Sequence, residues 1–75
     1  MDIDLTIEAE GLLCPLPVLK LRKRMAGLAP GAVVALRADD PAAVIDVPHF
    51  CAEAGHELLE TQSDGACAIY LVRKG

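Results

Sequence analysis

Two prolines set the strongest limit on how this chain can fold, because Pro15 and Pro17 separate a segment typical of a strand from one typical of a helix. Proline has no backbone N–H, so it is tolerated in the first turn of a helix or just before it, but not in a helix interior. A residue that precedes proline is steered toward an extended conformation. We therefore expect a helix to begin at these prolines, with Cys14 and Leu16 held outside it.

The segments on either side of the prolines have different periodicities. In residues 2–8, DIDLTIE, apolar and polar residues alternate, which predicts a half-buried strand. After the prolines the apolar residues are spaced by three, four and three positions, as in a helix with one buried side. The residues of this apolar stripe are Val18, Leu21, Met25 and Leu28. Pro30-Gly31 is expected to end the helix and to turn the chain.

A second helix is predicted in the middle of the chain. Asp39 or Asp40 is expected to cap it, and Pro41 to occupy its first position. Pro48 should interrupt this helix after a short first turn, so that the helix proper begins at Pro48. Gly55 is a natural residue for its C-terminal end.

Three further strands complete the predicted fold. Residues 32–38, AVVALRA, are typical of an inner strand, and residues 56–62 and 67–73 flank Asp64-Gly65, which is a strong hairpin signal. The order is therefore β-α-β-α-β-β, in which the two βα units predict parallel neighbours and the hairpin an antiparallel pair. Because so short a chain cannot supply two helical layers, we expect a two-layer α/β sandwich. Its four-stranded mixed sheet carries both helices on one face.

Length and composition restrict the classes of function. Seventy-five residues are expected to form one domain, residues 1–75, whose core is too small to enclose a deep site, so any chemistry should occur at the surface. A net charge of −4, one Phe, one Tyr and no Trp argue against a broad nucleic-acid surface and against base stacking. No apolar run approaches the ~18 residues of a membrane span.

The three cysteines are predicted to be free thiols. Their number is odd and the N-terminal residues do not resemble a secretion signal, so we expect a reducing, cytoplasmic compartment. Cys51 and Cys67 are interpreted as small buried apolar residues. No C-x-x-C sequence is present for a redox dithiol, and a zinc site from Cys14, His49, Cys51 and Cys67 lacks the usual paired ligand spacing. We expect neither a metal nor an organic cofactor.

Cys14 is the candidate reactive residue. It lies where the prolines predict a stiff segment ending at a helix N-terminus. The helix dipole and free backbone N–H groups there favour an anion, which predicts a lowered pKa for Cys14. The alternative is a buried apolar cysteine, as most free cysteines are, but two flanking prolines at a helix start favour the reactive role.

Four of the seven basic residues fall within residues 20–24. At ~1.5 Å of rise per residue, Lys20 lies about 9 Å and Arg24 about 15 Å along the helix from Cys14. These distances are near or beyond the ~8 Å Debye length, so the basic residues should affect the thiol little. We interpret Lys20, Lys23 and Arg24 as docking residues for an acidic partner surface; the alternative is an ordinary solvated helix face.

Several stretches together resemble one known family. GLLCPLPVLKLRK, followed by PG, ADDPAAVIDVPHFC, HELL and YLVRKG, is similar to the TusA-like, or SirA-like, sulfur-carrier family over essentially the whole chain. The family's Cys-Pro-x-Pro signature corresponds to Cys14-Pro15-Leu16-Pro17. The resemblance implies the same two-layer fold and a persulfide carried on Cys14, with Pro15 and Pro17 as the supporting motif. Several relatives have Arg before the cysteine where this chain has Leu13, which leaves the choice of donor and acceptor open.

The resemblance also implies a sulfurtransferase that acts with partner proteins. Sulfur would come from a cysteine desulfurase or a rhodanese and pass to a relay protein that serves tRNA thiolation, molybdenum-cofactor synthesis or sulfur oxidation. The protein is expected to be a monomer. Two alternatives remain from the residues themselves: a non-catalytic regulatory module that binds protein or RNA through its basic helix, and a peroxide-sensing thiol.

Overall fold

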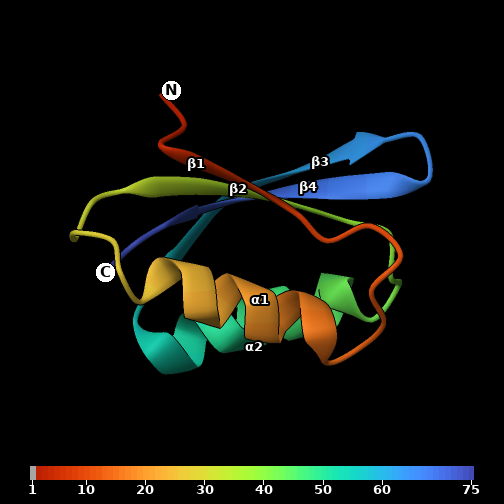
Figure 1. Cartoon of the computed structure of the whole chain (residues 1–75), viewed down its shortest axis with the longest axis horizontal. Coiled ribbons are helices and arrows are strands. Elements are labelled where there is room, and N and C mark those ends of the chain that lie inside the picture. The colour runs from red at the N-terminus through yellow and green to blue at the C-terminus, as the bar shows by residue number, and fades with distance from the viewer. Residues whose placement is uncertain (1) are drawn as a thin grey trace.

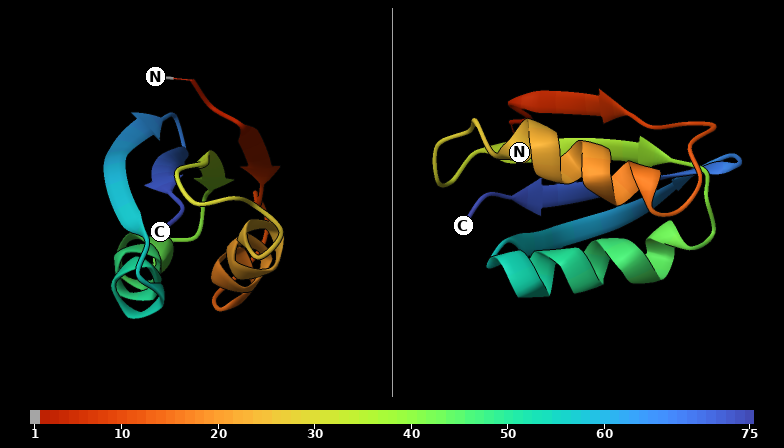
Figure 2. Two further views of the ribbon diagram at one scale, coloured as in Figure 1. Left: turned by 90° about the vertical axis from the view of Figure 1, so that its left-hand side faces the viewer. Right: turned by 60° about the horizontal axis from the view of Figure 1, so that its bottom comes forward.

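Two layers make up the protein in a computed structural model that describes residues 2–75 (Figure 1). The elements in chain order are β1 (Leu5–Glu8), α1 (Leu16–Met25), β2 (Val33–Ala38), α2 (Ala43–Ala54), β3 (Glu57–Asp64) and β4 (Cys67–Arg73). The strands form a four-stranded mixed sheet, and both helices lie on the same face of it (Figures 1 and 2). The predicted two-layer α/β sandwich in the order β-α-β-α-β-β is confirmed.

The strand order differs from the simplest expectation. The order across the sheet is β1-β2-β4-β3, with β1 parallel to β2 and with β4 antiparallel to both of its neighbours. The prediction of parallel neighbours is correct for β1 and β2 but wrong for β2 and β3, because β4 lies between them. Polarity explains this arrangement: β4 reads CAIYLVR, and its residues 70–72 are buried, which suits an inner strand. Most of β3 is polar and exposed, which suits an edge strand.

The core lies between the helices and the covered face of the sheet. Alternate strand residues point into it, as a period of two requires. The sheet contributes Ile7, Val34, Leu36, Tyr70 and Val72, and the helices contribute Leu21, Met25, Val47 and Phe50, all at most 4% exposed. Of the predicted apolar stripe, Leu21 and Met25 are buried, while Val18 and Leu28 are partly buried and pack against this core.

The start of α1 confirms one expectation at the prolines and corrects another. Cys14 lies outside the helix and Pro15 is its N-cap residue, but Leu16 is the first helical residue rather than part of the extended segment. The Leu16 N–H donates to the Leu13 carbonyl (2.8 Å), and the Leu19 N–H donates to the Pro15 carbonyl (3.1 Å). These bonds close the first turn and outweigh the extended preference of a residue before proline.

The expected break in the second helix does not occur. α2 is continuous from Ala43 to Ala54 with Pro48 inside it, and its N-cap residue is Ala42 without a side-chain cap. The hydrogen bond that Pro48 cannot make would go to the carbonyl of Val44, so the helix continues with one backbone hydrogen bond fewer, next to a residue that is 60% exposed. Gly55 ends α2 as predicted, with a left-handed φ of 78°.

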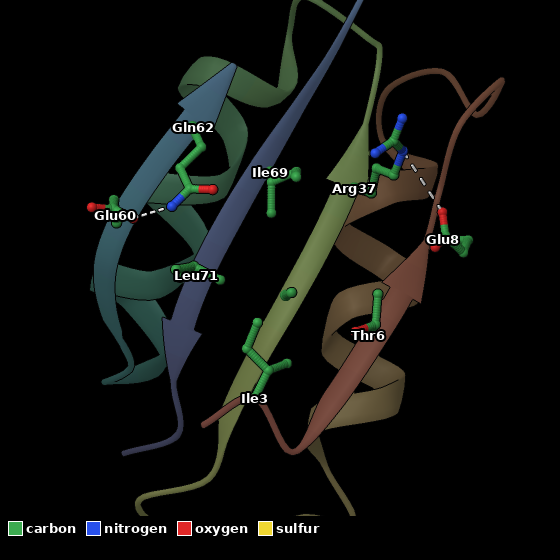
Figure 3. Close-up of a pocket in the computed structure, with 9 residues that line it drawn as sticks. Ile3, Thr6, Glu8, Arg37, Glu60, Gln62, Ile69 and Leu71 are labelled. Carbon is green, nitrogen blue, oxygen red and sulfur yellow. Dashed lines mark hydrogen bonds and ion pairs between the residues drawn. The ribbon is translucent and has the colours of Figure 1, made fainter. Parts of the chain in front are cut away.

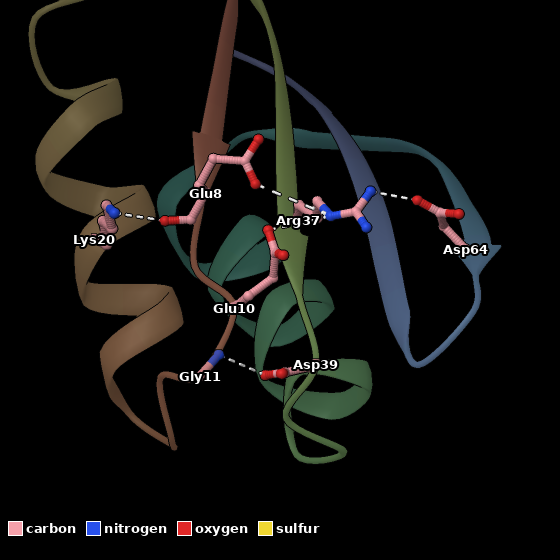
Figure 4. A network of polar contacts seen from close by, with 7 residues as sticks. All are labelled: Glu8, Glu10, Gly11, Lys20, Arg37, Asp39 and Asp64. Carbon is pink, nitrogen blue, oxygen red and sulfur yellow. Dashed lines mark hydrogen bonds and ion pairs between the residues drawn. The ribbon is translucent and has the colours of Figure 1, made fainter.

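A polar network ties the end of β1 to β2 and to the hairpin (Figure 4). Arg37 of β2 contacts Glu10 at 3.1 Å and Glu8 at 4.0 Å, and it also pairs with Asp64 at the end of β3. On the other side of β1, the Lys20 ammonium of α1 donates to the Glu8 carbonyl. These contacts fix the point at which the chain leaves β1 for the segment that carries Cys14.

The other face of the sheet carries no helix within residues 2–75 and contains a hollow of about 410 Å³ (Figure 3). Ala35 and Leu71 form buried parts of its floor. Ile3 also lines it and is 47% exposed, so the strand predicted from the alternation in residues 2–8 is wrong at Ile3. The strand begins only at Leu5, and the alternation therefore does not extend back to Ile3.

Two neighbouring leucines of α1 offer a matched test of this packing. Leu21→Ala removes a side chain that is 0% exposed and is expected to lower the free energy of unfolding by about 2–5 kcal/mol. Leu19→Ala removes a side chain that is 48% exposed and should change it by less than about 0.5 kcal/mol. Urea denaturation of both variants measures the difference. Equal losses would contradict the assignment of the buried side of α1.

Candidate functional site

The segment that leads from β1 into α1 lies at the end of the sandwich where both helices begin (Figures 1 and 2), and Cys14 belongs to this segment. Cys14 immediately precedes the N-cap residue Pro15. Its thiol is free and exposed, whereas Cys51 is buried and Cys67 is partly buried. Among the three cysteines, Cys14 is therefore the most accessible to a large partner.

Two adjacent carboxylates hold the segment that carries Cys14. The Gly11 N–H donates to Asp39 Oδ1 at 2.9 Å (Figure 4), and the Cys14 N–H donates to Asp40 Oδ2 at 2.5 Å. Asp40 Oδ1 also accepts the Ala42 N–H at 3.2 Å. These aspartates were expected to cap α2, but the N-cap residue of α2 is Ala42 and has no side-chain cap. Their main hydrogen bonds instead connect the β2–α2 connection to the Cys14 segment.

A third carboxylate contacts the thiol itself. Cys14 Sγ lies 2.9 Å from Asp46 Oδ2, with the thiol as donor and the carboxylate as acceptor. Asp46 lies in the first turn of α2, and the buried residues Val47 and Phe50 fix the rotation of that helix against the core. Asp46 belongs to the sequence motif that carries the family resemblance, but no feature of the sequence alone assigned it a contact with Cys14.

The carboxylates reverse the expected effect on the thiol. The hydrogen bond to Asp46 raises the pKa of Cys14 above its ordinary value, and desolvation and the charges of Asp46 and Asp40 act in the same direction. The prediction of a lowered pKa was wrong. Most of the donors on which it depended are missing, since Pro15 and Pro17 have no N–H and the Leu16 N–H is bonded to the Leu13 carbonyl.

A shallow groove of about 170 Å³ runs from Cys14 between the two helices. Arg22 of α1 lies in its lining with the guanidinium carbon 5.3 Å from the centre of the Phe50 ring. His49 Nε2 is 2.8 Å from Glu53 Oε1, one turn along α2. The groove thus contains acidic, basic and apolar groups beside an exposed thiol, which is a surface suited to contact with another protein.

The basic residues of α1 do not form one cluster in space. Lys20 is partly buried and donates to the Glu8 carbonyl, while Lys23 and Arg24 are exposed. Arg22 lines the groove beside Cys14, although sequence reasoning selected its three basic neighbours as docking residues and left Arg22 out. Helical spacing contained the missing signal, because Arg22 follows Val18 by four residues and so shares its side of α1.

The cysteines considered as zinc ligands lie in different parts of the fold. Cys51 is 2% exposed in the core, where burial raises the pKa of its thiol. Cys67 precedes the inward-facing Ala68 and so points to the opposite face of the sheet. In residues 2–75, no three His, Cys, Asp or Glu side chains are grouped so as to hold a metal ion, and no helix is long and apolar enough to cross a membrane.

The sequence and the fold both match known proteins. A family model described as sulfurtransferase TusA matches residues 5–74. The crystal structure of a SirA-like protein from Desulfitobacterium hafniense superposes with a TM-score of 0.83 at 25% sequence identity, covering 95% of this chain and 97% of that chain. Proteins of the TusA family transfer sulfur in relay with partner proteins. Since the family match includes every strand and helix and the Cys14 segment, the chain belongs to the TusA sulfurtransferase family.

Proposed function

We propose that the protein carries sulfur as a persulfide on Cys14, which takes the sulfur from a donor protein and passes it to an acceptor protein. The observation that supports this most is the exposed thiol of Cys14 at the end of the sandwich, next to a groove rather than inside a pocket. An exposed thiol suits exchange with a cysteine on another protein, because each step requires direct contact of two sulfur atoms.

The transfer itself moves one sulfur atom between thiols. Cys14 attacks the terminal sulfur of a donor persulfide, a bond forms between Cys14 Sγ and that sulfur, and the donor's own S–S bond breaks. The donor leaves as a thiolate and takes up the proton that Cys14 gives up. Delivery repeats the exchange: the acceptor's cysteine attacks the outer sulfur, and Cys14 leaves as a thiolate that takes up the proton given up by the acceptor's cysteine. No oxidant or reductant is consumed, since the sulfur keeps its oxidation state.

The partners of this protein would be a sulfur donor and a sulfur acceptor. A cysteine desulfurase or a rhodanese would supply the persulfide, and a relay protein for tRNA thiolation, molybdenum-cofactor synthesis or sulfur oxidation would receive it. Because free thiols are required at every step, the relay belongs in a reducing compartment such as the cytoplasm. The exposed residues Lys23 and Arg24, together with Arg22 in the groove, would contact an acidic part of the partner. Lys20 contributes less, since it is already bonded to Glu8.

The first prediction is that sulfur accumulates on Cys14 alone. The protein is incubated with a cysteine desulfurase and cysteine, and peptide mass spectrometry without reducing agent locates the added sulfur atom. The Cys14 peptide should gain one sulfur, and the gain should survive Cys67→Ser but vanish in Cys14→Ser. Sulfur on Cys67 with Cys14 unmodified would contradict the proposal. Full function of Cys14→Ser in cells would instead favour a regulatory module that does not use the thiol.

The second prediction concerns the exposed charges of α1. Changing both Lys23 and Arg24 to Glu should slow sulfur transfer with a protein partner and weaken the dependence of its rate on salt, because charges at the rim of an interface act mainly on association. The free energy of unfolding should change little, since both side chains are exposed.

A control separates docking from thiol chemistry in that double variant. Cys14 should react with a neutral alkylating reagent at the wild-type rate, because neither charge is in the groove lining beside the thiol. If transfer with each partner tested keeps its wild-type rate and salt dependence, Lys23 and Arg24 form only a solvated helix face.

A further inference from the structure

The surroundings of Cys14 are unusual for a nucleophile. Reactive cysteines commonly lie beside a cation, a histidine or a helix end with free N–H groups, all of which favour the thiolate. Cys14 instead has the Asp46 carboxylate 2.9 Å from its sulfur and the Asp40 carboxylate 2.5 Å from its backbone nitrogen. The chain places two negative charges next to the atom that must itself become negative in order to react.

The cations near the groove offset these charges only in part, because the carboxylates Asp46, Asp40 and Glu53 outnumber the one arginine, Arg22. The charged and titratable groups that line the groove or contact Cys14 are Asp46, His49 and Glu53 from α2, Asp40 from the β2–α2 connection, and Arg22 from α1. Arg22 lies over the Phe50 ring, and His49 is paired with Glu53. Lys20, on another side of α1, donates to the Glu8 carbonyl. The balance of charge at Cys14 is therefore negative.

We propose that Asp46 holds Cys14 as a neutral, latent thiol, and that efficient sulfur exchange at Cys14 requires a partner whose own Lys or Arg side chain pairs with Asp46. This inference rests on the proposed sulfur-carrier function and states what chemistry a donor or acceptor must bring. Asp46 acts here as a positioning residue that sets the protonation state of the reacting sulfur. It is well placed to do so because it projects from a helix that is fixed against the core.

The same contact slows both halves of the exchange in the absence of a partner. Loading requires attack by the Cys14 thiolate, and release requires Cys14 to depart as a thiolate, so a carboxylate that disfavours this anion opposes each step. In the loading reaction, Cys14–SH and R–S–SH give Cys14–S–SH and R–SH, and the proton passes from Cys14 to the departing sulfur. A partner cation that neutralises Asp46 lowers the barrier in both directions. Small thiols without a cation would exchange slowly, which protects the carried sulfur.

The partner's surface is expected to carry two charged regions of opposite sign. A cation should lie beside the partner's cysteine, opposite Asp46 and Asp40, while acidic groups farther away face Lys23 and Arg24 of α1. These two requirements are complementary to the two charged regions of this chain: carboxylates at the thiol and exposed basic residues along the helix. A partner that was acidic throughout would be repelled at the point of transfer.

The first test is the alkylation rate of Cys14 against pH, measured by peptide mass spectrometry with the neutral reagent iodoacetamide. Asp46→Asn keeps the size of the side chain and removes its charge, so the midpoint should fall by about one pH unit and the rate at neutral pH should rise about tenfold. Glu60→Gln removes one negative charge from β3 at the hollow of the uncovered sheet face and should leave the midpoint unchanged. An unchanged or higher midpoint in Asp46→Asn would overturn the proposal.

The second test measures the preference for a cation directly, with two small disulfides. Wild-type Cys14 should react faster with cystamine, which carries two ammonium groups, than with the neutral 2-hydroxyethyl disulfide. Asp46→Asn should reduce this ratio several-fold, whereas Glu60→Gln should keep it, which separates a local contact from the overall negative charge of the chain. The two reagents have different leaving groups, but this difference is the same for every variant. It therefore cancels when the rate ratio of one variant is divided by that of another. A ratio that Asp46→Asn leaves intact would contradict a partner cation at Asp46.

A second variant at Asp46 guards against a folding defect, and the choice of readout separates this inference from the proposed function. Asp46→Ser replaces the carboxylate with a smaller, uncharged side chain and is expected to behave like Asp46→Asn. A folding defect in one of the two variants therefore does not determine the result. Neither measurement involves sulfur transfer. Failure of wild-type Cys14 to accept sulfur from a desulfurase would therefore refute the proposed function alone, and an unaltered pH profile in Asp46→Asn would refute the latent-thiol inference alone.

Discussion

The candidate site depends on three hydrogen bonds between two segments of the chain. Three carboxylates in residues 39–46 accept them, and groups in residues 11–14 donate them. Asp39 receives the Gly11 N–H, Asp40 the Cys14 N–H, and Asp46 the Cys14 thiol. The segment that carries Cys14 has left the sheet and has not yet entered α1, so only a few turn hydrogen bonds hold its backbone apart from these carboxylates. These bonds therefore decide where the thiol lies and which groups surround it. They also explain why Cys14 is exposed and yet fixed in position.

The prolines beside the thiol have two opposite consequences. They end the extended segment and start α1, which presents Cys14 at the end of the molecule. They also remove two of the backbone N–H groups that normally make a helix start favourable for an anion. A cysteine at a helix N-terminus is thus activated only when that terminus has donors to offer. Here the nearest polar group is a carboxylate, and activation is left to whatever binds next to it.

Most of the fold could be predicted from the sequence because its signals are local. The alternation in β1, the apolar stripe of α1 and the turn at Gly65 each fix an element without reference to the rest of the chain. The position of β4 between β2 and β3 and the ties from Asp39 and Asp40 depend on pairings between distant residues. Capping was the best local explanation for those aspartates, and it was incomplete because their partners lie 26 and 28 residues away.

Cys14 is central to this account as a thiol that its own protein keeps protonated. The most direct measurement is a titration of wild-type protein labelled with ¹³C at the cysteine Cβ atoms, in which the chemical shift of Cys14 is followed by NMR as the pH rises. The contact with Asp46 predicts a midpoint above the value of about 8.5 for an unperturbed cysteine. A midpoint at or below that value would mean that the helix start controls the thiol after all, and that Cys14 is activated before any partner binds.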